Sequence, residues 1–180
     1  MRGLTRLAAT VLLTLGLAGC VTMTVNSRLE SGVDFTRYRS WDFGAQDGVA
    51  TGDARLDNNR FFVDALQGAI DTGMSARRFL RAERGQAPDL LVHYHTSVTQ
   101  RFQVDEPDST CLGQNCRASV IDYDQGTLVV DVVDRMTGKL LWRGWAQDSV
   151  NGLIDNQDRM TEQVRQSVQK IMALFPQTPL

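Results

Sequence analysis

The spacing of apolar residues along the chain predicts a set of strands and two helices. Alternating and β-branched residues predict strands, because successive side chains of a strand point to opposite faces. The alternation is clearest in residues 127–134 and 139–147, which are typical of a hairpin turned by residues 136–138. Further strands are expected at residues 21–26, 39–43, 79–82 and 90–102.

The long strand expected at residues 90–102 has two different faces. One face is apolar and is expected to join the core, and the other is polar and is expected to be solvated. The apolar face carries Leu90, Val92, Tyr94, Val98 and Phe102, and the polar face carries His93, His95, Ser97, Thr99 and Arg101.

Two stretches repeat apolar residues with the three- and four-residue spacing of an amphipathic helix. Residues that suit an N-cap precede both stretches, and Pro176 ends the second one. The first helix, expected at 58–76 and capped by Asp57 or Asn58, has the apolar stripe Phe62, Leu66, Ala69, Ile70, Gly73 and Met74. The second, capped by Asp155 or Asn156, has the stripe Met160, Val164, Val168, Ile171, Met172 and Phe175.

These elements predict the fold class. Strands flanked by two amphipathic helices, rather than alternating with many, indicate an α+β domain. We expect a two-layer sandwich, in which a mainly antiparallel sheet carries both helices on one face. Residues 103–125 have no clear period and are expected to form a long loop.

The N-terminal residues have the features of a secretory signal peptide. Arg2 and Arg6 supply its positive charge, and residues 7–17 are almost wholly apolar. That run is too short to span a bilayer, which takes about 20 residues. Residues 17–20 (Leu-Ala-Gly-Cys) resemble the lipobox of bacterial lipoproteins. We therefore expect residues 1–19 to be removed.

Removal of the signal would leave residues 20–180 as a single periplasmic domain with Cys20 as its lipid-bearing N-terminus. In lipobox proteins this Cys carries a diacylglyceryl group and a further acyl chain such as palmitate, and two or more chains give stable anchoring. Val21 stands where an Asp would favour the inner membrane, so we expect anchoring in the outer membrane, facing the periplasm. Because a strand is expected directly after Cys20, the body should lie within about 20 Å of the bilayer, the reach of six extended residues.

The charge of the chain bears on its partners. The formal charge is −2, and it becomes −4 when residues 1–19 and their two Arg are removed. Lys occurs only at Lys139 and Lys170, so the sequence has no cluster of Lys. Nucleic-acid-binding domains carry basic patches. We therefore expect the membrane and an envelope protein as partners, and no nucleic acid.

Cys111 and Cys116 are separated by four residues that suit a tight turn, Leu-Gly-Gln-Asn. An oxidising periplasm favours a disulfide between them. The alternative is a pair of metal ligands, which would need a second pair such as His93 and His95.

The assembled features resemble the domain of unknown function 4136 family of bacterial lipoproteins. The resemblance implies the location and the fold, and it implies no activity and no functional residues. It rests on residues 34–41 (Asp-Phe-Thr-Arg-Tyr-Arg-Ser-Trp), 88–94 (Pro-Asp-Leu-Leu-Val-His-Tyr), 126–134 (Gly-Thr-Leu-Val-Val-Asp-Val-Val-Asp), 138–146 (Gly-Lys-Leu-Leu-Trp-Arg-Gly-Trp-Ala) and 168–176.

His93 and His95 are the first candidates for chemistry, because residues two apart on a strand point the same way. Such a pair can bind a metal, or one His can act as a base. Their polar neighbours on the strand favour a solvated surface instead. Trp142 and Trp145 should lie on opposite faces of one strand, one in the core and the other as a surface anchor.

Five carboxylates lie in or beside the expected loop, and they lack the ligand spacing of a calcium loop, which favours a solvated acidic segment. The sequence shows no recognised catalytic motif, and we expect no cofactor. The five are Asp105, Glu106, Asp108, Asp122 and Asp124.

The leading functional hypothesis is therefore a non-catalytic binding or assembly module at the inner face of the outer membrane. Its expected partner surface is the tip of the loop, with Asp105, Glu106 and Asp108, together with Trp145. Two alternatives stay open. One is a carrier of lipid or of a small apolar ligand, and the other is a periplasmic enzyme that uses His93 and His95.

Overall fold

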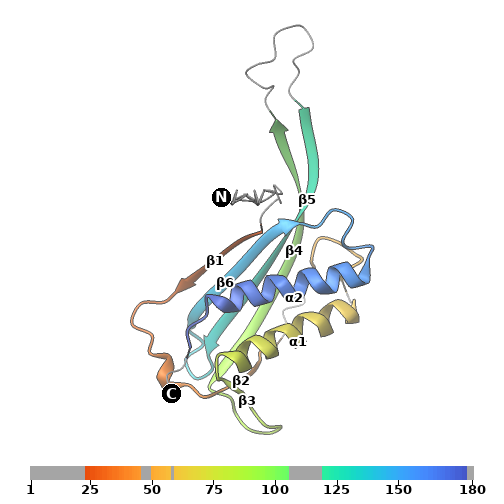
Figure 1. Ribbon diagram of the computed structural model, residues 1–180. Coiled ribbons are helices and arrows are strands. Elements are labelled where there is room, and N and C mark those ends of the chain that lie inside the picture. The colour runs from red at the N-terminus through yellow and green to blue at the C-terminus, as the bar shows by residue number, and fades with distance from the viewer. Residues whose placement is uncertain (1–22, 46–49, 58, 106–118, 178–180) are drawn as a thin grey trace, which may run out of the picture.

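Two layers, a six-stranded sheet and a pair of helices, make up the part of the chain that the structure describes (Figure 1). The structure is a computed structural model that describes residues 23–45, 50–57, 59–105 and 119–177. The elements are β1 (Thr24–Leu29), the short 3-10 helix η1 (Phe35–Arg37), β2 (Ser40–Phe43), α1 (Arg60–Ala76), β3 (Leu80–Arg81), β4 (Leu90–Asp105), β5 (Ser119–Asp134), β6 (Leu140–Ser149) and α2 (Gln157–Ala173).

The sheet has the strand order β1-β6-β5-β4-β2-β3. Strands β1, β6, β5 and β4 pair antiparallel, whereas β2 pairs parallel with both β4 and β3. Both helices cover the same face of this sheet (Figure 1). The predicted two-layer α+β sandwich with a mainly antiparallel sheet is thus confirmed, with parallel pairing confined to one edge.

Most predicted strands are found close to their expected positions. Strand β1, however, ends three residues later than predicted. Residues 27–29 still pair with β6, as far as Leu29 opposite Trp142. The prediction began this strand at Val21, and residues 21 and 22 lie outside the described part of the chain.

Each helix begins at a residue whose side chain caps it. Asn59 accepts a hydrogen bond from the N–H of Phe62 at 3.1 Å, so the predicted cap of α1 at Asp57 or Asn58 is wrong by one residue or more. Asn156 caps α2 in the same way, as one of its two predicted caps. Among the described residues, no helix is long and apolar enough to cross a membrane.

Aromatic rings fill the core at the end of the sheet where β4 begins. Phe175, just after α2, contacts the rings of Phe35, Phe79 and Trp142, with centroids 5.2, 5.4 and 4.9 Å away. Trp142 is 1% exposed, and Trp41 beside this cluster on β2 is fully buried. Burial of such large side chains dominates the stability of a core of this size.

At the opposite end, β4 and β5 continue beyond the rest of the sheet as a two-stranded arm (Figure 1). We define the arm as residues 100–105 and 119–124, because β6 ends opposite Gln125 and the pairing of β4 with β5 continues to Asp105 opposite Ser119. The prediction of a loop over all of residues 103–125 is therefore wrong at both ends. Residues 106–118, with Glu106, Asp108 and both Cys, lie outside the described part.

The arm also corrects a predicted burial. Phe102 was expected in the core, because it continues the apolar face of β4. It is 65% exposed, since the helices end before the arm begins (Figure 1).

Candidate functional site

The sheet face that turns away from both helices carries the residues that the sequence analysis selected for chemistry. His93 and His95 lie on this face of β4 and are partly exposed. Val92, which lies on the opposite face of β4 toward the helices, is fully buried. On β6, Trp142 belongs to the core and Trp145 is partly exposed on the outer face, as their spacing predicts. The outer face is therefore the surface on which the candidate residues meet.

Trp145 lies on the outer face of β6, the strand next to the edge strand β1. Its register partners are Asn26 on β1 and Val129 on β5, and Val129 in turn pairs with His95 on β4. Directly opposite residues of adjacent strands are side-chain neighbours on one face. The row therefore joins an aromatic, an aliphatic and an imidazole side chain across three strands.

The neighbouring row contains an ion pair between a buried carboxylate and a half-exposed guanidinium. Asp131 is 6% exposed, and it accepts hydrogen bonds from Nε and Nη2 of Arg143 at 2.6 Å each. This bond to Asp131 raises the pKa of the Arg143 guanidinium. Both carboxylate oxygens are thus engaged by one fork of the guanidinium, which is the strongest geometry for such a pair.

His93 is the register partner of Asp131 and packs against β2. A Cβ at Gly44 would overlap the imidazole of His93, so the glycine is what allows the ring to lie there. An acid does stand beside His93, but its two oxygens already bind Arg143. Within the described ranges, no group of three or more His, Cys, Asp or Glu could hold a metal ion.

A pocket of about 80 Å³ lies on the opposite side of the sheet, between the sheet and the two helices near the base of the arm. Its lining is mostly apolar, and Gln163 and Asp148, which also line it, hydrogen-bond to each other at 2.5 Å. The pocket can accept an apolar group without leaving those two side chains unpaired. Its apolar lining includes Phe62, Leu66, Val98, Leu128, Met160 and Val164.

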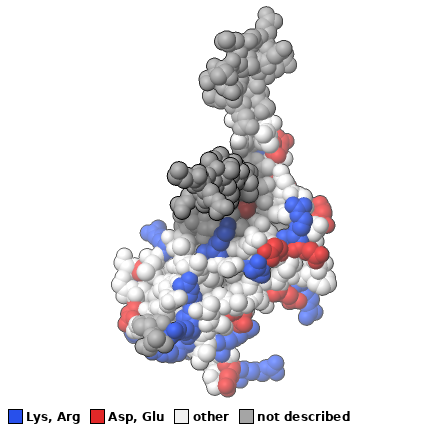
Figure 2. Space-filling model, viewed as in Figure 1, with Lys and Arg blue, Asp and Glu red and all other residues white. Residues whose placement is uncertain are grey.

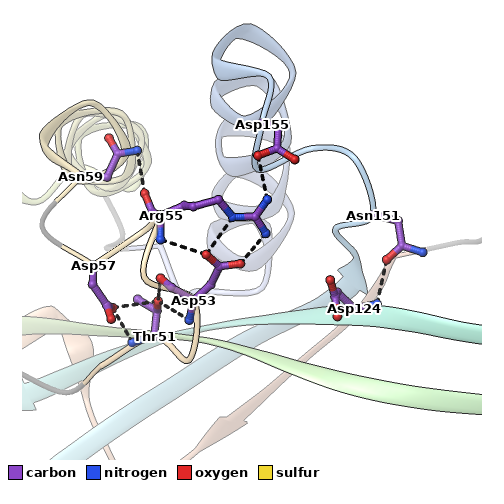
Figure 3. A network of polar contacts seen from close by, with 8 residues as sticks. All are labelled: Thr51, Asp53, Arg55, Asp57, Asn59, Asp124, Asn151 and Asp155. Carbon is purple, nitrogen blue, oxygen red and sulfur yellow. Dashed lines mark hydrogen bonds and ion pairs between the residues drawn. The ribbon is translucent and has the colours of Figure 1, made fainter.

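A network of polar contacts joins the loops that precede the two helices, beside this pocket (Figure 3). Arg55 binds Asp53 at 2.6 Å and Asp155 at 2.7 Å, which links the loop before α1 to the loop before α2. The hydrogen bond from Arg55 lowers the pKa of Asp53. Thr51 donates from its N–H and its hydroxyl to Asp57, at 2.8 and 2.9 Å.

The structure brings together only part of the predicted partner surface. Asp105 is the last residue of β4, at the end of the arm, and Trp145 lies on the body of the sheet. Glu106, Asp108, Cys20 and the pair Cys111–Cys116 lie outside the described residues. The described part of this surface therefore consists of two separate regions.

Two features escaped the sequence analysis. The Asp131–Arg143 pair was missed because it needs the strand register, although a lone Asp inside an aliphatic run (Val-Val-Asp-Val-Val) was a signal. The exposed apolar residues of the arm were missed because Phe102 was assigned to the core, whereas Val104 and Val120 fall in the stretch that showed no clear period. On the helix side seen in Figure 2, Lys and Arg side chains lie next to Asp and Glu.

A model of the family described as "Domain of unknown function (DUF4136)" matches residues 25–177. The match covers nearly all of the described residues and confirms the resemblance seen in the sequence. No curated protein matches the sequence.

Three solved structures illustrate the likeness in fold. A PDZ domain protein from Parabacteroides distasonis aligns with a TM-score of 0.53 and 16% identity over 88% of this chain, which spans only 37% of that protein. The PelC dodecamer from Paraburkholderia phytofirmans aligns with a TM-score of 0.49 and 9% identity over 88% of this chain and 100% of that one. A DUF4136 family protein from Bacteroides thetaiotaomicron gives 0.48 and 13% over 81% and 93%. At 16% identity, the likeness to the first of these structures concerns the fold alone.

Proposed function

The chain belongs to the DUF4136 family, and from this premise we propose that it is a non-catalytic binding module of the bacterial cell envelope. A lipid on Cys20 holds it to the inner face of the outer membrane, and it binds an envelope protein through the outer face of its sheet. The observation that carries the proposal is the partly exposed Trp145 on a sheet whose helices both cover the other face.

The composition of this face suits a protein partner. Tryptophan and arginine are enriched where proteins bind one another, and a few such residues supply most of the binding energy. Trp145 lies beside Val129 and two residues from Arg143, whose guanidinium is held by Asp131. Side chains that are fixed on paired strands lose little freedom on binding, so little affinity is lost to ordering them.

The anchor is supported by the sequence and by the length of the chain that follows it. Residues 1–20 have the order of a lipoprotein signal, and Cys20 is only four residues before Thr24, where β1 begins. Such a short connection keeps the sheet close to the bilayer. The partner is therefore a protein that lies at the membrane or reaches it.

Site-specific photocrosslinking in whole cells tests this function. A photoreactive residue at position 26 should trap a specific envelope protein, because Asn26 is exposed and is the register partner of Trp145, which stays in place. The matched control is position 80, since Leu80 is 72% exposed and lies on the edge strand β3. Equal trapping at both positions, or none at 26, would contradict the proposal.

A second function is favoured by the pocket between the helices and the sheet. Its volume of about 80 Å³ is roughly half that of a 150 Å³ cavity that binds benzene, so it suits a short apolar group. Native mass spectrometry of protein prepared without detergent should then show a bound small molecule. Val164→Phe, which fills the pocket, should remove that mass, and a spectrum of free protein alone would exclude this second function.

A further inference from the structure

The arm exposes apolar side chains that have no place in the core. Phe102, Val104 and Val120 are 65, 59 and 62% exposed. Phe102 and Val104 are two apart on β4, and Val104 pairs with Val120 on β5, so the three share one face. A cluster of this kind on an extension of the fold marks a surface that contacts something other than the protein's own core.

Strand β1 begins at the end of the sheet from which the arm extends. Strand β1 is antiparallel to β6, β6 to β5, and β5 to β4, so β1 runs in the direction opposite to β4. The register places Thr24 level with Gln147, Thr127 and Ser97. Figure 1 shows the start of β1 near the base of the arm.

The reach of the chain then limits where a lipid on Cys20 can be. Cys20 lies four residues before Thr24, so its Cα is at most about 14 Å beyond that level. Along β4, Phe102 is five residues beyond Ser97, or about 17 Å, and Asp105 is about 27 Å beyond it. With the strands upright on the membrane, the arm would extend past the plane in which the lipid is attached.

We propose that the face of the arm formed by Phe102, Val104 and Val120 docks on the same bilayer leaflet that holds the lipid of Cys20. This inference rests on the lipid anchor of the proposed function. A bilayer is favoured over a protein partner because the short connection keeps the base of the arm within about 14 Å of the lipid. The binding would be driven by burial of apolar side chains at the boundary between headgroups and acyl chains, so it needs no anionic lipid.

Acidic residues limit the depth of this contact. Asp122 is the register partner of Phe102, and Asp124 is two residues further along β5, so both carboxylates lie on the same face as the apolar cluster. An ionised carboxylate is costly to move into hydrocarbon. The contact is therefore shallow, with Val104 and Val120 toward the acyl chains and Phe102 beside Asp122 at the level of the headgroups.

The contact would give the protein a second attachment point beside its lipid. A single flexible tether leaves a domain free to rotate, whereas a tether together with a docked arm fixes its orientation. The outer sheet face with Trp145 would then be presented at a constant height above the membrane.

Tryptophan quenching in vesicles tests the arm. The lipidated mature protein is reconstituted in phosphatidylcholine vesicles whose acyl chains carry bromine near the headgroup, and emission is compared with that in unbrominated vesicles. Phe102→Trp and Val104→Trp each add a probe on the arm to the native Trp41, Trp142 and Trp145. Leu80→Trp is the control, since Leu80 is 72% exposed and pairs with Ser40 at the other end of the sheet.

The added emission of both arm variants should be lost in brominated vesicles, and that of the Leu80 variant should be retained. Flotation of the same vesicles separates the two claims. Protein that floats without quenching of the arm overturns this inference and leaves the anchor standing, whereas protein that fails to float overturns both. A tryptophan that is shifted to the blue but unquenched means that protein covers the arm, which also overturns the inference.

Discussion

Arg143 on β6 and Asp131 on β5 face each other across two strands and are joined by two hydrogen bonds of 2.6 Å each. Asp131 is nearly buried, while the side chain of Arg143 is 48% exposed. The guanidinium therefore covers a carboxylate that would otherwise be buried without a cation. The pair adds a side-chain link between the two paired strands that carry Trp145 and Val129.

Removal of Arg143 should destabilise the fold more than a surface substitution does. Arg143→Ala leaves the carboxylate of Asp131 buried and unpaired, and we expect a loss of about 1–2 kcal/mol, reduced because Arg143 is half exposed. Urea denaturation at pH 7 measures the change. Arg28→Ala is the matched control in the same row of the sheet, with an expected change within about 0.5 kcal/mol. Equal effects of the two variants would show that the pair contributes nothing.

Asp89 gives the fold a dependence on pH. Its Oδ2 accepts hydrogen bonds from the N–H groups of Arg39 and Ser40 at 2.8 and 2.9 Å, which joins the start of β2 to the start of β4. The N–H of Ser40, followed by that of Arg39, lowers the pKa of this carboxyl below its usual 3.8. A lowered pKa means that the stabilisation is complete above the unfolded value and is lost as the pH falls through the folded value.

Asp89→Ala should therefore lower the free energy of unfolding by about 1–3 kcal/mol at pH 7, and this difference from the native chain should shrink below about pH 4. Asp89→Asn is the control, because its amide oxygen still accepts both bonds without titrating. Denaturation curves between pH 7 and pH 3 provide the measurement. A difference between native and Asp89→Ala chains that stays constant over this range would refute the assignment.

Two glycines of α1 should respond to the same substitution in opposite directions. A Cβ at Gly73 would lie 2.6 Å from Cγ of Met172 on α2, whereas a Cβ at Gly68 would meet nothing within 4 Å. Gly73→Ala should thus cost about 1–3 kcal/mol through overpacking, and Gly68→Ala should stabilise by about 0.5–1 kcal/mol through helix propensity. Thermal unfolding of both variants tests this prediction. A stabilised Gly73→Ala protein would show that Met172 and α2 move aside without cost.

The sequence predicted those elements whose apolar pattern has a single period and a single buried face. Helix α2, strand β6 and the turn between β5 and β6 are of this kind and were placed within a few residues, whereas β5 begins at Ser119, eight residues before its predicted start. The cap of α1 was misplaced because residues 57–59 (Asp-Asn-Asn) all suit an N-cap and only the structure shows that Asp57 binds Thr51.

The strands of the arm were not predicted, for a different physical reason. Both of its faces are exposed, so no buried face imposes a period, and β5 leaves the arm for the body of the sheet through the polar run Asp122-Tyr123-Asp124. The site was predicted only residue by residue. His93 and Trp145 were identified from their spacing, but their relation to Asp131 and Arg143 depends on a register that involves three strands.

The proposed disulfide between Cys111 and Cys116 should matter little to the global fold. Both residues fall between Asp105 and Ser119, whose strands are already paired, and the bridge would close only a short loop. Replacing both Cys by Ser should therefore change stability by less than about 2 kcal/mol. Thiol titration of the native protein checks the bridge itself, and a large loss of stability in the double variant would contradict its local role.

The proposed function depends most on the outer sheet face, so the most direct measurement is the yield of a partner crosslinked in cells from a photoreactive residue at position 26, beside Trp145. We compare the native chain with Trp145→Ser, and with Leu80→Ser as the matched control, at equal expression and with thermal unfolding as the check of the fold. A hot-spot tryptophan contributes about 2 kcal/mol or more to binding, so Trp145→Ser should reduce the yield at least about tenfold while Leu80→Ser leaves it unchanged. An unchanged yield for a folded Trp145→Ser protein would contradict the assignment of this face as the binding surface.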